Sequence, residues 1–285
     1  MKVSNFLLRF IVFIVGVPLL FLAVLAVPHP NYPLFLIIVL AAAALSGQES
    51  AGLFLYPEDD YPGNRIIAAA LGLVIPAGTT LVVFELLPEH GIFGLLLVSF
   101  ALINAGQVFR KGSESIRRII PSISGHTMTL LYPGIFLGYA VRLTTFPDAG
   151  ALIVVFLAAV FFNDTMAYVT GRLFGGRSQG VVSISPNKSL AGFVGGLASS
   201  PLAILIAEVV RPGLFPRHFG LQIVFGLLVG LAVILGDLVE SGIKRSAGVK
   251  DSGTLIPGRG GLLDSIDSPV FVAPFFYYLY MVFFL

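Results

Sequence analysis

The sequence predicts an all-α polytopic integral membrane protein with about nine transmembrane helices. Hydrophobic residues make up 56% of the 285 positions and charged residues only 11%. Apolar runs of about 20 residues, the length that crosses roughly 30 Å of hydrocarbon, recur along the whole chain. A mean hydropathy of +0.96 excludes an ordinary soluble domain. The net charge of +2 gives no basis for nucleic-acid binding, and the absence of cysteine excludes disulfide and thiolate chemistry.

The first apolar run is too long for a signal-peptide core and ends without a small-residue cleavage pattern, so we expect it to be a retained helix. The predicted helices span residues 6–27, 34–56, 65–87, 91–109, 120–141, 149–171, 191–210, 219–243 and 269–285. Glu49 interrupts the second run, and two prolines and His126 interrupt the fifth. These two are therefore the least regular of the nine.

The positions of the Lys and Arg residues predict the orientation, because cytoplasmic segments of membrane proteins are enriched in them. With the N-terminus in the cytoplasm, all 17 cations except Arg142, Arg211 and Arg217 fall on the cytoplasmic side. We therefore expect a cytoplasmic N-terminus, and a polar cavity that opens to the cytoplasm and to lipid.

The distribution of charge also predicts two functional parts. Residues 1–118 would form N-terminal transmembrane helices. Residues 119–285 would form a catalytic transmembrane region with cytoplasmic loops at 171–190 and 244–268.

Charged residues are concentrated between Gly236 and Asp267. Asp237, Ser241 and Lys244 follow one another at i, i+4 and i+7, which places them on one face of a helix. An ionisable side chain directly behind an apolar run costs about 3 kcal/mol unless it is paired or lines a wet cavity, so we interpret Asp237 as functional. Glu240 and Lys244 are spaced for an ordinary pair within the helix.

The segment that follows, residues 252–267, contains Pro257 and four glycines and is predicted to be a loop. Its backbone N–H groups could approach an anion closely. Asp264 and Asp267 lie one helical turn apart just before the last apolar run. Hard oxygen ligands without His or Cys suit Mg²⁺, which recruits one or two carboxylates together with substrate phosphates.

A second polar segment, SPNKS, precedes the predicted helix 191–210. Free N–H groups and the helix dipole make such a position a natural anion site. The residues that could contribute are Ser185, Asn187, Lys188 and Ser189. Another polar stripe contains Asp164, Tyr168 and Arg172.

Three further features carry weaker expectations. Glu49 lies near the cytoplasmic third of its helix and could line the same cavity. Glu208 is three residues from Arg211 and is expected to pair with it. The small residues of GFVGGLASS permit close helix packing within or between chains.

Residues 236–267, GDLVESGIKRSAGVKDSGTLIPGRGGLLDSID, resemble the signature of the phosphatidate cytidylyltransferases, the CDP-diacylglycerol synthases. That pattern runs Ser, two residues, Lys-Arg, four residues, Lys-Asp, then Pro-Gly-His-Gly-Gly and Asp-Arg-x-Asp. The residues in register are Ser241, Lys244, Arg245, Lys250, Asp251, Pro257, Gly258, Gly260, Gly261, Asp264 and Asp267. The segment 163–176 and the SPNKS turn are similar to the family's other cytoplasmic motifs, so the resemblance covers roughly residues 160–270.

This chain departs from the family pattern at three positions. Arg259 replaces the His of Pro-Gly-His-Gly-Gly, Ser265 replaces the Arg of Asp-Arg-x-Asp, and Ala191 replaces the Glu after the SPNKS turn. Because two of these changes fall in one loop, our hypothesis is that Arg259 supplies the cation missing at position 265.

The resemblance implies an enzyme of a bacterial inner membrane that faces the cytoplasm and uses CTP and phosphatidate as substrates. Its cofactors would be Mg²⁺ and a second metal ion, and the family allows a homodimer. It implies catalytic roles for Asp237, Lys244, Asp264 and Asp267, with the three aspartates as metal ligands. It implies nucleotide and phosphate binding by Ser185, Asn187, Lys188, Ser241, Arg245, Lys250 and Arg259.

Two alternatives stay open. A CTP-dependent polyprenol kinase or a CDP-archaeol-type synthase would share related helices and a cytosine nucleotide, although the spacing of the motifs favours the cytidylyltransferase. A cation-coupled transporter could use Asp164, Asp237 and Glu49 as an ion path in the membrane. Carboxylates clustered with cations and glycines in one cytoplasmic loop argue against a transporter, whose site would lie near the midplane.

Overall fold

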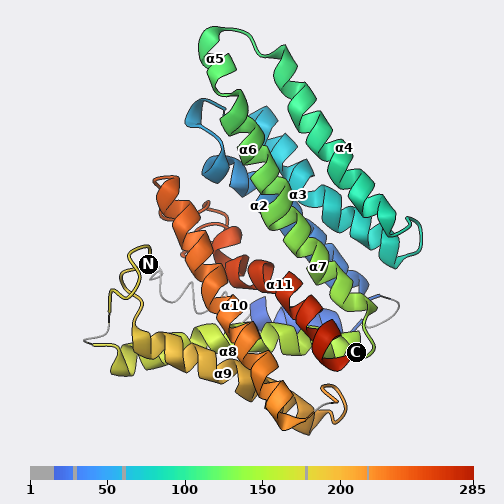
Figure 1. Cartoon of the computed structure of the whole chain (residues 1–285), viewed down its shortest axis with the longest axis vertical. Coiled ribbons are helices and arrows are strands. Elements are labelled where there is room, and N and C mark those ends of the chain that lie inside the picture. The colour runs from blue at the N-terminus through green and yellow to red at the C-terminus, as the bar shows by residue number, and fades with distance from the viewer. Residues whose placement is uncertain (1–15, 28–30, 60–61, 177–178, 217) are drawn as a thin grey trace, which may run out of the picture. The chain divides into compact units, whose positions relative to one another are not determined.

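The computed structural model describes residues 16–27, 31–59, 62–176, 179–216 and 218–285. Regular structure among them is helical (Figure 1). The main helices are α2 (Pro33–Phe54), α3 (Pro62–Val83), α4 (His90–Gly106), α5 (Ser113–Arg117), α6 (Ile119–Thr129), α7 (Phe136–Arg142), α8 (Ala149–Phe174), α9 (Leu190–Val210), α10 (Phe219–Ser246) and α11 (Leu263–Phe284). Short connecting turns are η1 (Pro57–Asp59), η2 (Gln107–Phe109), η3 (Leu130–Ile135) and η4 (Leu143–Thr145).

Seven of the helices in these ranges are long and apolar enough to cross a membrane: α2, α3, α4 with η2, α8, α9, α10 and α11. They coincide with seven of the nine predicted runs, and the prediction of an all-α polytopic membrane protein is confirmed. The predicted run 6–27 lies partly outside the described residues, and its described part contains the helix Gly16–Leu25. The number of spans and the cytoplasmic N-terminus stay predictions.

The remaining run, 120–141, is continuously helical but not regular. It forms α6, then the π-helical η3, then α7. Pro133 lies inside η3. Because proline has no backbone N–H and its ring crowds the preceding turn, one α-helical hydrogen bond is lost there, and the helix takes the wider π-helical turn around this residue.

The chain divides into two compact units. The first comprises the described residues up to Thr145 together with Ser246–Ser265. In this unit α2 packs along α3, and α3 also packs against η3 and α7. A Cβ on Gly47 would overlap the carbonyl oxygen of Ala68. The two backbones therefore approach closely because small residues lie at the contact.

The second unit comprises Phe146–Arg245 and Ile266–Leu285. Here α8 and α9 run side by side (Figure 1). The predicted small-residue face of α9 contacts α8: a Cβ on Gly192 would lie 2.8 Å from the Ala167 carbonyl oxygen. The buried Asn163 donates to Ser200 Oγ at 2.9 Å and to the Gly230 carbonyl oxygen at 3.3 Å. One amide side chain thus joins α8, α9 and α10.

An aromatic cluster forms the apolar core of the second unit. Phe276 lies with its ring centroid 5.4 Å from that of Phe156 and 5.3 Å from that of Phe225. Tyr280 packs in the same cluster and donates its hydroxyl to the Leu214 carbonyl oxygen at 2.9 Å. These contacts fix α11 against α8 and α10, and so fix the helices that carry the acidic residues of the candidate site.

Candidate active site

Two segments that are 49 residues apart in sequence meet at an ion pair in the second unit. Lys188, in the turn before α9, pairs through Nζ with Asp237 of α10. The Lys188 side chain is 24% exposed and that of Asp237 is 35% exposed, so the pair is partly shielded from solvent. The predicted nucleotide-binding turn and the predicted acidic helix therefore share one location.

The conformation of residues 180–189 holds Lys188 in place. Its N–H donates to the Ser185 carbonyl oxygen at 3.1 Å, and its own carbonyl oxygen accepts from the Gly180 N–H at 3.2 Å. Ser189 caps α9, with its side chain accepting from the Gly192 N–H at 3.1 Å. Ser185 is half-buried and Asn187 is exposed. The turn thus leads into the N-terminus of α9 and directs the Lys188 side chain toward α10.

Ser241 and Lys244, on the predicted polar face of α10, contact different acidic residues. Ser241 Oγ lies 3.5 Å from Asp237 Oδ1. Lys244 instead pairs with Glu240, which is fully buried. The expected pair one helical turn apart is confirmed, and it means that Lys244 would have to neutralise Glu240 as well as any bound phosphate.

Asp267 lies in the second turn of α11 and is half-buried. Its Oδ1 accepts from the Ser268 N–H at 2.7 Å. The charged groups of Asp237, Lys188 and Lys244 lie near enough to interact with its carboxyl group. The second unit therefore contains a cluster of two aspartates and two lysines.

A close helix contact accounts for this proximity. A Cβ on Gly236 would lie 2.7 Å from the Cβ of Phe271. Only glycine permits such an approach of α10 to α11, and Gly236 directly precedes Asp237. The residue beside the acid is thus small because the two helices touch there.

The glycine-rich loop belongs to the first unit. The loop prediction is correct for residues 252–262 and wrong for 263–267: α10 ends at Ser246, and α11 begins at Leu263, because Pro257 and the four glycines all precede that residue. The Ile256 N–H donates to the Gly260 carbonyl oxygen at 2.7 Å, and the Gly260 N–H returns a bond to Ile256 at 3.1 Å. Gly258 and Gly260 have φ values of 80° and 104°. The tight turn between them requires glycine, because a side chain is strained at these angles.

Asp264 fastens this loop to the start of α11. Its Oδ2 accepts from the Ser252 N–H at 2.7 Å, from the Ser252 hydroxyl at 2.9 Å and from the Gly261 N–H at 2.8 Å. Gly260 must stay without a side chain, since a Cβ there would lie 2.7 Å from the same oxygen. Asp264 is therefore a structural anchor of the loop in addition to any role as a ligand.

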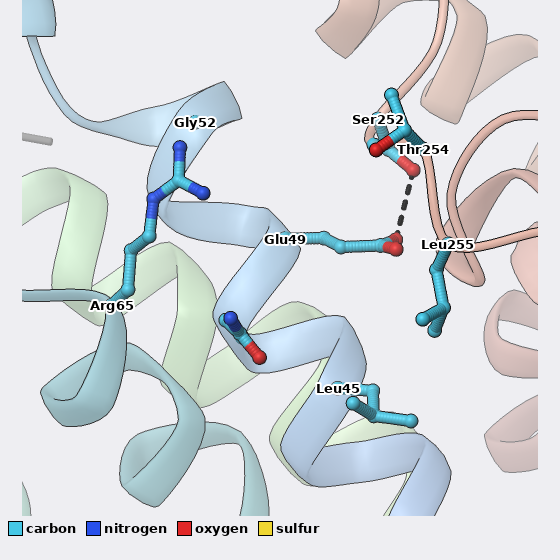
Figure 2. Close-up of a pocket in the computed structure, with 9 residues that line it drawn as sticks. Leu45, Glu49, Gly52, Arg65, Ser252, Thr254 and Leu255 are labelled. Carbon is cyan, nitrogen blue, oxygen red and sulfur yellow. Dashed lines mark hydrogen bonds between the residues drawn. The ribbon is translucent and has the colours of Figure 1, made fainter. Parts of the chain in front are cut away.

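Glu49 of α2 reaches the same loop within the first unit, and Figure 2 shows its side chain pointing at Ser252. A cavity of about 370 Å³ is lined by α2 around Glu49, by Arg65 and by residues 252–255. Glu49 therefore lines a cavity of the first unit, and the expectation that this cavity is shared with the predicted site stays a prediction. Sequence reasoning did not select Ser252, which carries no signal beyond being one serine in a loop.

Of the remaining predicted cations, two are exposed and one is half-buried. Arg245, near the end of α10, and Lys250 are exposed. Arg259 is half-buried at the tip of the Ile256–Gly260 turn, and its N–H donates to the Ile256 carbonyl oxygen at 3.0 Å. The geometry leaves the roles of these three residues as predictions.

Within the described ranges, no three His, Asp or Glu side chains come close enough together to hold a metal ion by themselves. Mg²⁺ often takes only one or two carboxylates and completes its shell with phosphates and water. Asp237, whose charge interacts with that of Asp267, fits that requirement, because like charges close together are stabilised by a cation. The complete set of Asp237, Asp264 and Asp267 draws on both units and stays a prediction.

One expected ion pair is wrong. Glu208 does not pair with Arg211; its two oxygens accept from the Gly213 N–H at 2.9 Å and the Phe215 N–H at 2.8 Å. Arg211 pairs instead with Asp148. The chain turns immediately after α9, so the N–H groups of that turn point back at Glu208, which a helical spacing rule does not anticipate.

Comparison with known proteins adds two findings. Residues 7–283 match the family model described as "Cytidylyltransferase family". The chain is 44% identical over 151 residues to the phosphatidate cytidylyltransferase of Staphylococcus haemolyticus (strain JCSC1435), covering 52% of this chain and 55% of the relative. It is 29% identical over 242 residues to the phosphatidate cytidylyltransferase of Helicobacter pylori (strain J99), covering 78% and 84%.

A third relative is named only as uncharacterized protein YnbB of Escherichia coli (strain K12). It is 39% identical over 188 residues, which are 64% of this chain and 60% of the relative. For YnbB and the Staphylococcus haemolyticus enzyme, the chain covers less than two thirds of the relative's length.

Proposed function

The chain belongs to the cytidylyltransferase family, and we propose that it is a phosphatidate cytidylyltransferase, which converts CTP and phosphatidate to CDP-diacylglycerol and pyrophosphate. The observation that supports this most is the contact between Lys188 and Asp237. It joins the SPNKS turn to the acidic helix, two segments that both resemble motifs of this family. The names of the Staphylococcus and Helicobacter relatives support the same activity.

In the proposed reaction, an oxygen of the lipid phosphate forms a bond to the α-phosphorus of CTP. The bond from that phosphorus to the bridging oxygen of pyrophosphate breaks, and the electron pair leaves with pyrophosphate. No general base is needed, because the phosphate nucleophile is already ionised at neutral pH. The barrier is mostly repulsion between anions and their alignment, which fixed cations lower.

Residues of this chain would supply those cations. Lys188 and Lys244 are the lysines of the cluster, and each is already positioned by a carboxylate, Asp237 and Glu240 respectively. We assign to them the phosphates nearest the reacting phosphorus. Further binding would come from Ser185, Asn187, Ser241, Arg245, Lys250 and Arg259.

The proposal includes a divalent metal ion, with Mg²⁺ as the first choice because the donors are carboxylate oxygens. Asp237 would hold one ion and Asp264 a second. When bound, a metal ion would neutralise charge on the phosphate oxygens. Asp267 would either bind directly or orient the other ligands.

We place the site at the cytoplasmic boundary of a bacterial inner membrane. The enrichment of Lys and Arg in the loops on that side supports this orientation. CTP would enter from the cytoplasm, and phosphatidate would enter sideways so that its acyl chains stay in hydrocarbon. The predicted division at residue 118 and a homodimer also remain part of the proposal.

The test uses purified protein in phosphatidate-containing vesicles with Mg²⁺ and CTP labelled at the α-phosphate or, separately, at the γ-phosphate. We expect the α-label in lipid and the γ-label in pyrophosphate. Transfer of the γ-label to lipid would indicate a kinase instead. An absence of any turnover, with Asp237→Asn indistinguishable from the unchanged protein, would refute the proposal.

A further inference from the structure

We propose that Glu49 is a positioning residue for this reaction: from α2, it holds the glycine-rich loop and the first turn of α11 in the conformation that orients Asp264. This inference rests on the proposed function for its kinetic consequences. The contacts that carry it lie entirely within the first unit.

Glu49 accepts three hydrogen bonds from residues more than 200 positions away in sequence. Its Oε1 accepts from the Leu262 N–H at 2.7 Å. Its Oε2 accepts from the Leu263 N–H at 2.8 Å and from the Ser252 hydroxyl at 3.0 Å (Figure 2). Leu263 begins α11, so two of these donors are N–H groups at the start of a helix, which have no partner within the helix. An acidic side chain at that position is favoured by the helix dipole as well.

The same loop segments are held by Asp264. Ser252 and Gly261 donate to Asp264 Oδ2, while Ser252 and the two residues after Gly261 donate to Glu49. A hydroxyl has one hydrogen, so Ser252 Oγ can donate to only one of the two carboxylates at a time. Anchoring by Glu49 therefore bears directly on how firmly the loop holds Asp264.

The fit around Glu49 is also steric. A Cβ on Gly253 would lie 2.9 Å from Glu49 Oε1. A Cβ on Gly261 would overlap both Glu49 Oε2 and Ser252 Oγ. Two glycines of the loop thus lie where the carboxylate leaves no room for a side chain.

The decisive substitution is Glu49→Gln. All three partners are donors, and a glutamine offers one acceptor oxygen and an NH₂ group that would face an N–H. We expect kcat to fall roughly ten- to a hundredfold. The KM for CTP should change less than kcat, because only Lys250 and Arg259 of the proposed nucleotide-binding residues lie in this loop. Glu49→Asp keeps both acceptor oxygens and should recover part of the loss. Glu58→Gln, the same change at an exposed position in η1, is the matched control and should have no effect.

A second readout does not depend on activity. Hydrogen exchange should become about tenfold faster in peptides covering residues 250–263 of Glu49→Gln, while peptides from α8 and α9 stay unchanged. Ser252→Ala removes one of the three donors and should give a smaller change in the same peptides.

Normal kcat or unchanged exchange over 250–263 in Glu49→Gln would overturn the proposal. Faster exchange throughout the protein with a lowered melting temperature would also overturn it, because Glu49 would then be needed for folding in general. If the unchanged protein does not turn over CTP, the proposed function fails, and the exchange comparison still decides whether Glu49 anchors the loop.

Discussion

Replacing Lys188 by methionine removes the cation that pairs with Asp237 while keeping a side chain of similar length. If Lys188 acts through that pair, the effects on activity of removing Lys188 and of removing the Asp237 charge should not be additive. The perturbation is therefore a cycle of three proteins, Lys188→Met, Asp237→Asn and the double variant, each compared with the unchanged chain.

The exposure of the two side chains sets the expected size of the effect. At 24% and 35% exposed, the pair lies between surface pairs, which contribute about 0.2–1 kcal/mol, and buried pairs, whose disruption costs about 3–5 kcal/mol. An intermediate value of about 2 kcal/mol corresponds to a loss of roughly 30-fold in kcat/KM, because each 1.4 kcal/mol is a factor of ten. Asp237→Asn should lose more, since Asp237 is also a proposed metal ligand.

The assay is transfer of the α-label of CTP into lipid, with Lys111→Met as the control for removing an exposed lysine. We expect the double variant to be no worse than Asp237→Asn alone. If the double variant loses a further 30-fold or so, the two residues act independently, and the pairing seen between the SPNKS turn and α10 does not serve catalysis.

Three other predictions follow from separate parts of the chain. Arg259→Ala should lower turnover of CTP at least about tenfold, and adding Ser265→Arg should restore part of it, because the hypothesis gives the two positions one cation between them. Asn163→Leu should lower the melting temperature in detergent by about 2–4 °C, since an interhelical hydrogen bond of this kind contributes about 1 kcal/mol. Hydrogen bonding from Arg142 holds the pKa of Glu89 below its ordinary value of 4.5. The stability that this gives is present above pH 4.5 and is lost as pH falls through the lowered pKa, so Glu89→Gln should melt earlier than the unchanged protein at about pH 7, and the difference should shrink as the pH falls below 4.5.

Each of these has a contrary outcome. Arg117→Ala, at an exposed arginine, is the control for Arg259→Ala. Equal turnover in the two variants would refute the hypothesis that Arg259 supplies the cation missing at position 265. The Asn104 side chain donates to the Phe100 carbonyl oxygen of its own helix, so Asn104→Leu should leave the melting temperature unchanged. An equal fall in melting temperature for Asn163→Leu and Asn104→Leu would mean that the bonds of Asn163 between helices do not stabilise the protein. A melting difference for Glu89→Gln that persists at the lowest pH would mean that charge is not its cause.

Much of the membrane architecture could be predicted because hydrophobicity in a bilayer is a local property. A run such as 149–171 must be helical, since every backbone polar group in hydrocarbon needs a partner within its own segment. The prediction was least accurate for run 120–141, where Pro133 turns a regular helix into α6, η3 and α7. The extent of that disturbance depends on how α3 packs against η3, which local sequence does not contain.

For the candidate site, the motif residues could be selected from the sequence, and their resemblance to a known signature indicated the cytidylyltransferase family. Their partners were not. The pairs Lys188–Asp237 and Arg211–Asp148 each join residues about 50 or 60 positions apart. In both cases a helical spacing rule had offered only neighbours on the same helix.

The sequence by itself determined that this is a helical membrane protein with its acids, cations and glycines in residues 236–267, because composition and short-range spacing are written in consecutive residues. Only the tertiary structure decided that Glu49, a lone acid in an apolar helix, binds the glycine-rich loop. That contact requires three donors, each more than 200 positions from Glu49 in sequence, to lie around its carboxylate. Such convergence follows from the packing of the chain, and no pattern along it records where distant backbone N–H groups will point.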